Sequence, residues 1–157
     1  MIWSPDCPIF RDDEGTLLDE PQLASFITSP APNAGATAEN RPEELPQIPE
    51  VFRRRSEYVL ALAAFKGCRR LVLGAWGCGV FRNDPAVVAA AFVGHLRERA
   101  WSSRFERVVF SVFDPSPSSE TLTAFQRAVT QALEQPAKSP HGFASVSTPR
   151  YRRWALP

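Results

Sequence analysis

The sequence predicts an α/β fold in which helices pack on a mostly parallel sheet. Short apolar runs at 71–73 and 108–113 are typical of buried strands. Segments with helical periodicity precede, separate and follow these two runs. Such alternation of strands and helices along a chain is the pattern of layered α/β proteins.

The first fifty residues predict strands and a loop. Residues 9–11 and 23–28 are expected to be short strands, followed respectively by a polar turn and by a pair of prolines. Residues 31–50 are rich in proline and polar side chains. We therefore expect a long loop over 31–50.

A helix over 51–66 and a strand over 70–74 come next. Gly67 is expected to end the helix, because glycine adopts the backbone conformations that close helices. The spacing of large side chains predicts one packed stripe on this helix. Its members are Val51, Arg55, Tyr58, Leu62 and Phe65.

The next predicted helix, over 85–100, has a strong start signal. Asp84 suits the N-cap, and Pro85 suits the first helical position, where a missing N–H costs nothing. The inward face of this helix is expected to contain Val88, Ala91, Phe92 and Leu96.

A central strand is predicted over 107–113, followed by a last helix that Ser118 or Ser119 would cap. That helix is expected to end near Leu133. Its core stripe would consist of Leu122, Phe125, Val129 and Leu133. Residues 135–157 show no periodicity and are expected to be an irregular tail.

Length and composition predict a single small domain over 1–134. The net charge of +1 gives no basic field to attract nucleic acid or a membrane surface. The chain has 3 cysteines without paired spacing, so we expect no zinc site, no disulfide framework and a reduced, cytoplasmic setting. We find no secretory or membrane-spanning run in the sequence and no sign of a cofactor.

The segment 71–85 is the strongest functional signal, because a glycine-rich loop joins a buried strand to a helix start. Gly74, Gly77 and Gly79 allow a turn that directs several backbone N–H groups at one spot. A helix N-terminus beside them favours an anion, most often phosphate. The spacing is neither G-x-G-x-x-G nor a Walker loop. An ordinary strand-to-helix turn is the alternative at this point.

The amino-acid sequence of this loop, GAWGCGVFRNDP at 74–85, resembles that of the microbial-type poly(ADP-ribose) glycohydrolase family, a branch of the macrodomain fold. The segments CPIFRDD at 7–13 and SFITSPAPN at 25–33 also resemble that family, in its order and at about its spacing. The resemblance runs to about Leu133. It implies a macrodomain-like mixed sheet flanked by helices, with the N-terminal part of the full fold absent.

The resemblance also implies the ligand and its contacts. Ligands of such sheets bind outside the carboxyl ends of the strands, so Ser29–Asn33 is expected to lie beside the glycine-rich loop. The resemblance implies that ADP-ribose, or poly(ADP-ribose), binds there. The backbone N–H groups of 77–80 would hold the diphosphate, and Phe81 would pack on the distal ribose. Arg82 would reach a phosphate or point into solvent, while Asn83 and Asp84 would hold the loop and start the helix. The expected ligand-binding residues are Pro32, Asn33, Gly74, Ala75, Trp76, Gly77, Cys78, Gly79, Val80, Phe81, Arg82 and Asn83.

Catalysis in the family depends on a triple-glycine loop followed by a Gln-Glu-Glu element, and this sequence contains neither. Its Glu43-Glu44 pair lies on the wrong side of 25–33, so no catalytic residue is assigned. We expect either a fragment or a short form that has lost catalysis. Three functions stay open, namely a glycohydrolase completed by its missing half, a non-catalytic ADP-ribose or nucleotide-diphosphate binder, and an inactive relic. Loss of sheet partners also predicts marginal stability or a homodimer.

Four other features carry weaker functional hypotheses. Cys78 beside a helix start could be activated, but the sequence offers it no histidine partner, so we interpret it as a small loop residue. We expect His95 to be a satisfied or surface helix residue and Arg53–Arg55 to be a solvated face. Asp114 at a strand end is a weak candidate for ligand contact. We expect Trp76 to pack the loop onto the sheet.

Overall fold

The computed structural model describes residues 1–134 and 144–147, without the side chains of Arg99, Ser102 and 144–147. Contacts within the chain divide it into two compact units. These are Met1–Pro30 and the described part of Ala31–Pro149. The prediction of a single domain over 1–134 did not separate these units.

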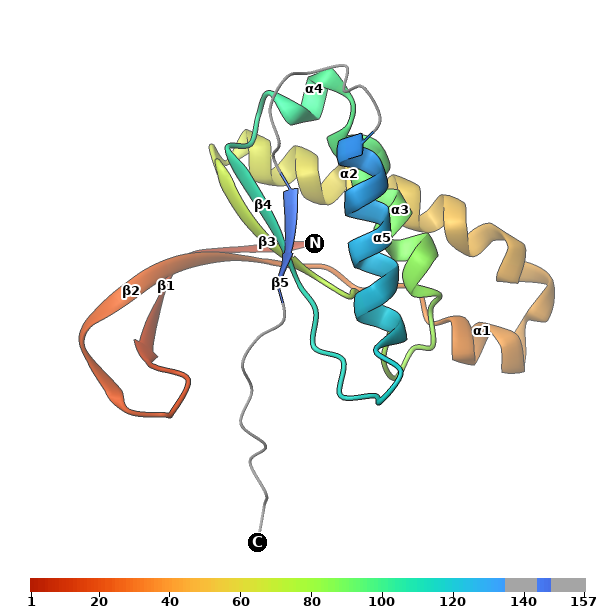
Figure 1. Cartoon of the computed structure of the whole chain (residues 1–157), viewed down its shortest axis with the longest axis horizontal. Coiled ribbons are helices and arrows are strands. Elements are labelled where there is room, and N and C mark those ends of the chain that lie inside the picture. The colour runs from red at the N-terminus through yellow and green to blue at the C-terminus, as the bar shows by residue number, and fades with distance from the viewer. Residues whose placement is uncertain (135–143, 148–157) are drawn as a thin grey trace, which may run out of the picture. The chain divides into compact units, whose positions relative to one another are not determined.

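The first unit is a β-hairpin. β1 (Ile2–Arg11) pairs antiparallel with β2 (Leu17–Thr28) (Figure 1). In this pairing, Trp3 lies opposite Ile27. Both strands are longer than the predicted 9–11 and 23–28. Prolines within them hid the strand pattern, although both strands of a two-stranded sheet are edges and tolerate proline.

The second unit contains a parallel sheet in the order β3 (Arg70–Gly74), β4 (Arg107–Ser111), β5 (Ala144–Ser147). β3 agrees with the prediction, and β4 ends two residues earlier than expected. β5 lies inside the segment expected to be irregular. A strand of four residues is too short to show periodicity, and it forms by pairing with β4.

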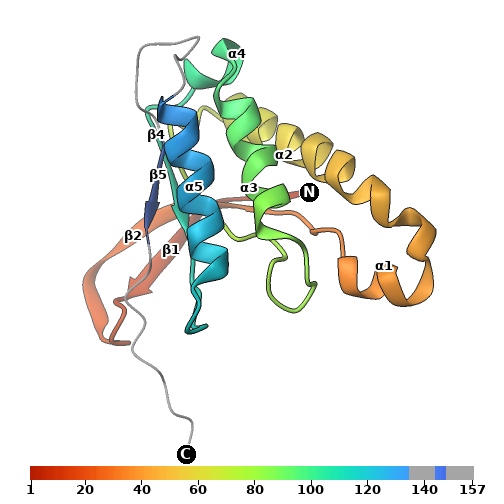
Figure 2. The same ribbon diagram turned by 45° about the vertical axis from the view of Figure 1, so that its right-hand side comes forward.

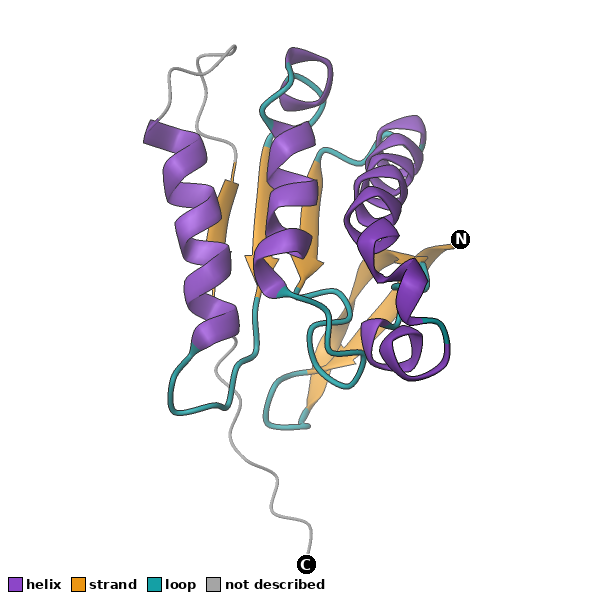
Figure 3. Ribbon diagram, turned by 90° about the vertical axis from the view of Figure 1, so that its right-hand side faces the viewer, coloured by secondary structure: helices purple, strands orange, loops and turns teal. Residues whose placement is uncertain are grey.

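Three helices cover one face of this sheet. They are α2 (Ile48–Phe65), α3 (Pro85–Leu96) and α5 (Glu120–Glu134), and Figures 2 and 3 show them side by side on the same face. The short α4 (Arg99–Ser102) occupies the end of the predicted helix over 85–100. All three long helices were predicted, with shifted ends.

The expected loop over 31–50 is wrong, because most of it is helical. α1 (Ala34–Asn40) begins at Asn33, whose side-chain oxygen accepts the N–H of Ala36 at 2.9 Å. A 3-10 helix, η1, follows over Pro42–Gln47. Pro42 and Pro49 lie in the first turns of η1 and α2, where proline is tolerated, so they mark helix starts and not a loop.

Aromatic side chains connect the sheet to all three helices. Val108, Phe110 and Val112 alternate along the strand direction and are fully buried. Ring centroids lie 5.6 Å apart for Phe52 and Trp76, and 5.9 Å apart for Trp76 and Phe92. Contacts at 6.2 Å and 5.4 Å continue the chain from Phe92 through Phe110 to Phe125. The glycine-rich loop therefore shares the core of the unit through Trp76.

The packed stripe of α2 differs from the prediction by one position. The buried residues are Phe52, Ser56, Val59, Leu60 and Ala63, whereas Tyr58 is 48% and Phe65 82% exposed. Both stripes repeat at helical spacing, and the stripe without Arg55 and Tyr58 is less costly to bury. On α5, Leu133 is 51% exposed in the last turn and does not join the core. On α3, Val88, Phe92 and Leu96 are buried as expected, while Ala91 is half-buried.

Candidate functional site

The glycine-rich loop, residues 74–84, leaves the carboxyl end of β3 and leads into α3. Figure 3 shows this loop, the start of α3 and α1 at the same end of the sheet. The Asp84 side chain accepts the N–H of Ala86 at 2.8 Å, and Pro85 occupies the first turn. The predicted helix start is confirmed. Ligands of open α/β sheets bind at this edge.

Asn83 joins the loop to the segment before α1. The side chain is 3% exposed, and its Nδ2 donates to the carbonyl oxygens of Pro32 at 2.8 Å and Gly77 at 2.9 Å. A second link is the Gly35 N–H, which donates to the Phe81 carbonyl at 3.0 Å. The two predicted ligand-contacting segments, 32–33 and 74–83, therefore lie together.

Two glycines of the loop have opposite surroundings. Gly77 has φ +74°, and a Cβ atom there would lie 2.6 Å from Asn83 Nδ2 and 2.7 Å from Ala31 Cβ. A Cβ atom on Gly79 would meet no heavy atom within 4 Å. Gly77 is needed for the packing of the loop. The space at Gly79 is open to a ligand.

Some backbone N–H groups of the loop are bonded within it, and others are not. Those of Trp76, Cys78, Arg82 and Asn83 donate to carbonyls inside the loop. Those of Gly79, Val80 and Phe81 donate to no other group of the described residues. Val80 is 92% exposed and Phe81 37% exposed. Accessible, unpaired N–H groups on successive residues can bind an anion.

Trp76 and Cys78 support the loop. Trp76 packs as expected, but its ring contacts are Phe52 of α2 and Phe92 of α3. Burial, and then the charge of Asp84, raises the pKa of Cys78 to about 12. The thiol therefore stays protonated at neutral pH, which argues against a nucleophilic role. Ala75 contributes a carbonyl that accepts the Cys78 N–H at 3.1 Å.

Arg82 lies between the loop and α1. It has φ 55°, and its Nη1 is 3.9 Å from Glu39 Oε1. The two side chains are 76% and 71% exposed, so the ion pair is weak and Arg82 can leave it at little cost. A Cβ atom on Gly35 would lie 3.3 Å from Arg82 Cδ.

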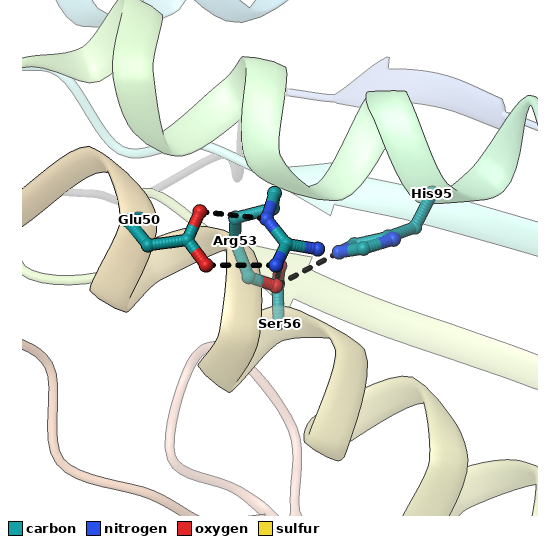
Figure 4. Close-up of polar contacts among 4 residues, drawn as sticks. All are labelled: Glu50, Arg53, Ser56 and His95. Atoms are coloured by element: carbon teal, nitrogen blue, oxygen red, sulfur yellow. Dashed lines mark hydrogen bonds and ion pairs between the residues drawn. The ribbon is translucent and has the colours of Figure 1, made fainter.

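The histidine of α3 is structural. His95 is 6% exposed, and its Nε2 lies 2.8 Å from the Arg53 carbonyl oxygen (Figure 4). A carbonyl only accepts, so Nε2 carries the proton in this contact. Arg53 itself makes paired hydrogen bonds with Glu50 at 2.7 and 2.8 Å, on the exposed side of α2. Both residues agree with the expectations from the sequence.

The Asp114 carboxylate caps the start of the following helix, α5. Its carboxylate accepts the N–H groups of Ser116, Thr121 and Leu122. The Ser116 hydroxyl also donates to it and is the main cause that holds the pKa of Asp114 below its ordinary value. Ser119 stands at the expected position before α5, and its carbonyl accepts the Thr123 N–H at 2.9 Å, but the Asp114 carboxylate supplies the side-chain acceptor for the first turn.

Within 1–134 and 144–147, no cluster of three or more His, Cys, Asp or Glu side chains could hold a metal ion. None of the helices in that part of the chain is long and apolar enough to cross a membrane. Glu44 of the Glu43-Glu44 pair makes an exposed ion pair with Arg41 at 3.0 Å.

Solved structures show what the chain is similar to. Poly(ADP-ribose) glycohydrolase from Deinococcus radiodurans, in complex with ADP-ribose, is 52% identical with a TM-score of 0.77, over 82% of this chain and 52% of that one. Its apo form gives 52% identity and a TM-score of 0.76, over 83% and 53%. The enzyme from Thermomonospora curvata is 50% identical with a TM-score of 0.74, over 80% and 46%. A scan against protein-family models and a search of curated proteins gave no match.

The similarity extends through most of this chain, at an identity that indicates common ancestry. The chain spans about half the length of the solved relatives. The chain is therefore similar to about half of a bacterial poly(ADP-ribose) glycohydrolase, and it shares the macrodomain-like α/β fold of that half.

Proposed function

We propose that the chain binds ADP-ribose, free or at an end of poly(ADP-ribose), through the outer part of the glycine-rich loop. The observation that carries this proposal is the row of accessible N–H groups on Gly79, Val80 and Phe81, which have no acceptor among the described residues. A diphosphate supplies acceptors for all three. ADP-ribose in the similar Deinococcus structure supports this choice of ligand.

Each part of the site has a distinct role in this proposal. The N–H groups of Gly79, Val80 and Phe81 bind the diphosphate, and the ring of Phe81 packs on the distal ribose. Pro32 and Asn33 border the same space, since Asn83 holds them to the loop. Arg82 moves from Glu39 to a phosphate, because its present ion pair is exposed and at 3.9 Å.

Turnover requires groups that we assign to no residue of this chain. Cleavage of a ribose–ribose bond needs a carboxylic acid placed to protonate the leaving oxygen. The sequence has no triple-glycine loop and no Gln-Glu-Glu element. We propose that the chain recognises ADP-ribose, and that hydrolysis requires the remainder of a glycohydrolase fold. A non-catalytic binder is the second candidate, favoured by the same absence.

Calorimetric titration with ADP-ribose tests the binding proposal. We expect saturable micromolar binding that Gly79→Glu abolishes. Two like charges about 4 Å apart repel by about 4 kcal/mol at an effective dielectric constant near 20, so the loss should exceed about 100-fold. Gly79→Gln introduces a side chain of similar size without the charge, so it distinguishes electrostatic repulsion from steric blocking of the site. Gly94→Glu, at an open glycine of α3, adds the same charge elsewhere.

Two more titrations complete the experiment. Phe81→Ala is expected to weaken ADP-ribose binding without lowering the melting temperature. A second titration uses ADP in place of ADP-ribose. A general nucleotide-diphosphate site would bind both with equal affinity, whereas a site that contacts the distal ribose would bind ADP-ribose more tightly. Equal affinity of the wild type and Gly79→Glu for ADP-ribose would refute the proposed site.

A further inference from the structure

We propose that Asn83 is a positioning residue that sets the spacing between the segment 31–35 and the exposed N–H groups of 79–81. This inference deepens the proposed function and rests on it for its effect on binding. The geometry of Asn83 in the unliganded chain carries the argument. The residue is 3% exposed and so offers little surface to a ligand directly.

The Asn83 carboxamide uses both of its hydrogens to connect separate segments. One bond reaches the Pro32 carbonyl, 51 residues away in sequence, and the other reaches the Gly77 carbonyl across the loop. The backbone N–H of Asn83 also donates to the Gly77 carbonyl at 3.3 Å. A single side chain therefore fixes two chain segments relative to the start of α3.

The two hydrogen bonds donated by Nδ2 determine the orientation of the Asn83 amide, at the expense of its oxygen. Oδ1 is buried and has no hydrogen-bond partner in the described part of the chain. An unpaired buried acceptor is costly. Turning the amide over would place Oδ1 against two carbonyl oxygens and lose both donor bonds. The arrangement keeps the two links and leaves the acceptor unsatisfied.

Gly77 makes room for this arrangement. The space that a Cβ atom at position 77 would fill is occupied by Asn83 Nδ2 at 2.6 Å and Ala31 Cβ at 2.7 Å. On the far side of the loop, the Phe81 carbonyl accepts the Gly35 N–H. Without the Asn83 hydrogen bonds, both the segment 31–35 and the loop would be free to move, and the bond from the Gly35 N–H to the Phe81 carbonyl would weaken. Exchange of the Gly35 amide hydrogen therefore measures the spacing in the absence of a ligand.

Hydrogen exchange at the Gly35 amide is the direct test. We expect exchange at least about tenfold faster in Asn83→Ala and in Asn83→Asp at neutral pH, since a carboxylate has no hydrogen to donate. Asn40→Asp is the matched control. Asn40 Nδ2 also donates to a backbone carbonyl, that of Ala36 at 2.8 Å, but the residue is exposed and touches neither link.

The pH dependence separates positioning from loss of packing. In Asn83→Asp, two nearby carbonyls disfavour the carboxylate and raise its pKa above the ordinary value of about 3.9. Protonation restores one donor. Protection of Gly35, corrected for intrinsic exchange, should therefore recover in Asn83→Asp as the pH falls through the raised pKa, and it should stay low in Asn83→Ala at every pH. Unchanged Gly35 exchange in both variants would overturn the inference.

ADP-ribose affinity distinguishes this inference from the proposed function. If the wild type binds and Asn83→Asp loses affinity at neutral pH but regains it on acidification, both stand. Binding by all variants with one affinity refutes the positioning role alone. Absence of binding by the wild type refutes the proposed function, while the Gly35 exchange still decides whether Asn83 sets the spacing.

Discussion

The inner and outer parts of the glycine-rich loop use the same residue type for opposite reasons. In the inner part, Gly77 is crowded, has a positive φ and contacts Asn83. In the outer part, Gly79 faces open space beside unpaired N–H groups. A glycine pattern in a sequence therefore combines positions that build a loop with positions that leave room for its ligand. Substitutions can separate the two.

The largest expected effect on stability comes from Trp76, the core contact of the inner part. Trp76→Ala removes ring contacts with Phe52 and Phe92 and should lower the free energy of unfolding by about 3 kcal/mol. Val80→Ala, in the outer part, should change it by less than about 0.5 kcal/mol. Urea denaturation measures both. Equal effects would remove the distinction between the two parts.

The two glycines give a sharper comparison, because the substitution is the same. Gly77→Ala should cost at least about 1–2 kcal/mol, since φ is +74° and the new methyl group meets Asn83 and Ala31. Gly79→Ala should leave the free energy of unfolding within about 0.5 kcal/mol of the wild type. A large loss at Gly79 would show that the outer part also carries structure.

The loop after β4 differs from the outer part of the glycine-rich loop, because a side chain of its own, Asp114, accepts the N–H groups at the start of the next helix. Asp114 accepts the N–H groups that begin α5, and its pKa is lowered, chiefly by the Ser116 hydroxyl. A carboxyl group with a lowered folded-state pKa stabilises the fold above its unfolded pKa, about 3.9, and loses that contribution as the pH falls through the folded value. Wild-type and Asp114→Asn melting temperatures should differ at neutral pH and converge at acid pH. A constant difference would contradict this.

The smallest expected effect concerns Cys78, between the two glycines. Its pKa of about 12 predicts that iodoacetamide labels it slowly from about pH 7 to about pH 10, compared with the same cysteine in the urea-unfolded chain. Mass spectrometry of the labelled peptide gives both rates. Equal rates in the folded and unfolded chains would show that burial does not protect the thiol.

The sequence predicted the elements that flank the glycine-rich loop better than the segments farther from it. β3, the Asp84 cap and the helices after it follow from local signals, namely an apolar run, a capping side chain and helical periodicity. The meeting of 32–33 with the loop follows from the rule for strand ends. The links made by Asn83 could not be predicted in detail, because they depend on carbonyls brought together by tertiary structure.

The errors have common physical causes. Pro42 and Pro49 were interpreted as loop residues, although proline fits the first turn of a helix equally well. On α2, two adjacent stripes share the same spacing, and only packing against Trp76 and the sheet distinguishes them. β5 has four residues and depends on β4 for its hydrogen bonds.

Amide chemical shifts during an ADP-ribose titration test the central claim most directly. The structure predicts large shifts for the N–H groups of Gly79, Val80 and Phe81, which have no acceptor within the described residues. It predicts smaller shifts for Cys78 and Arg82, whose N–H groups are bonded inside the loop. Shifts centred elsewhere on the chain, or none at saturating ADP-ribose, would contradict the division of the loop into a structural part and a binding part.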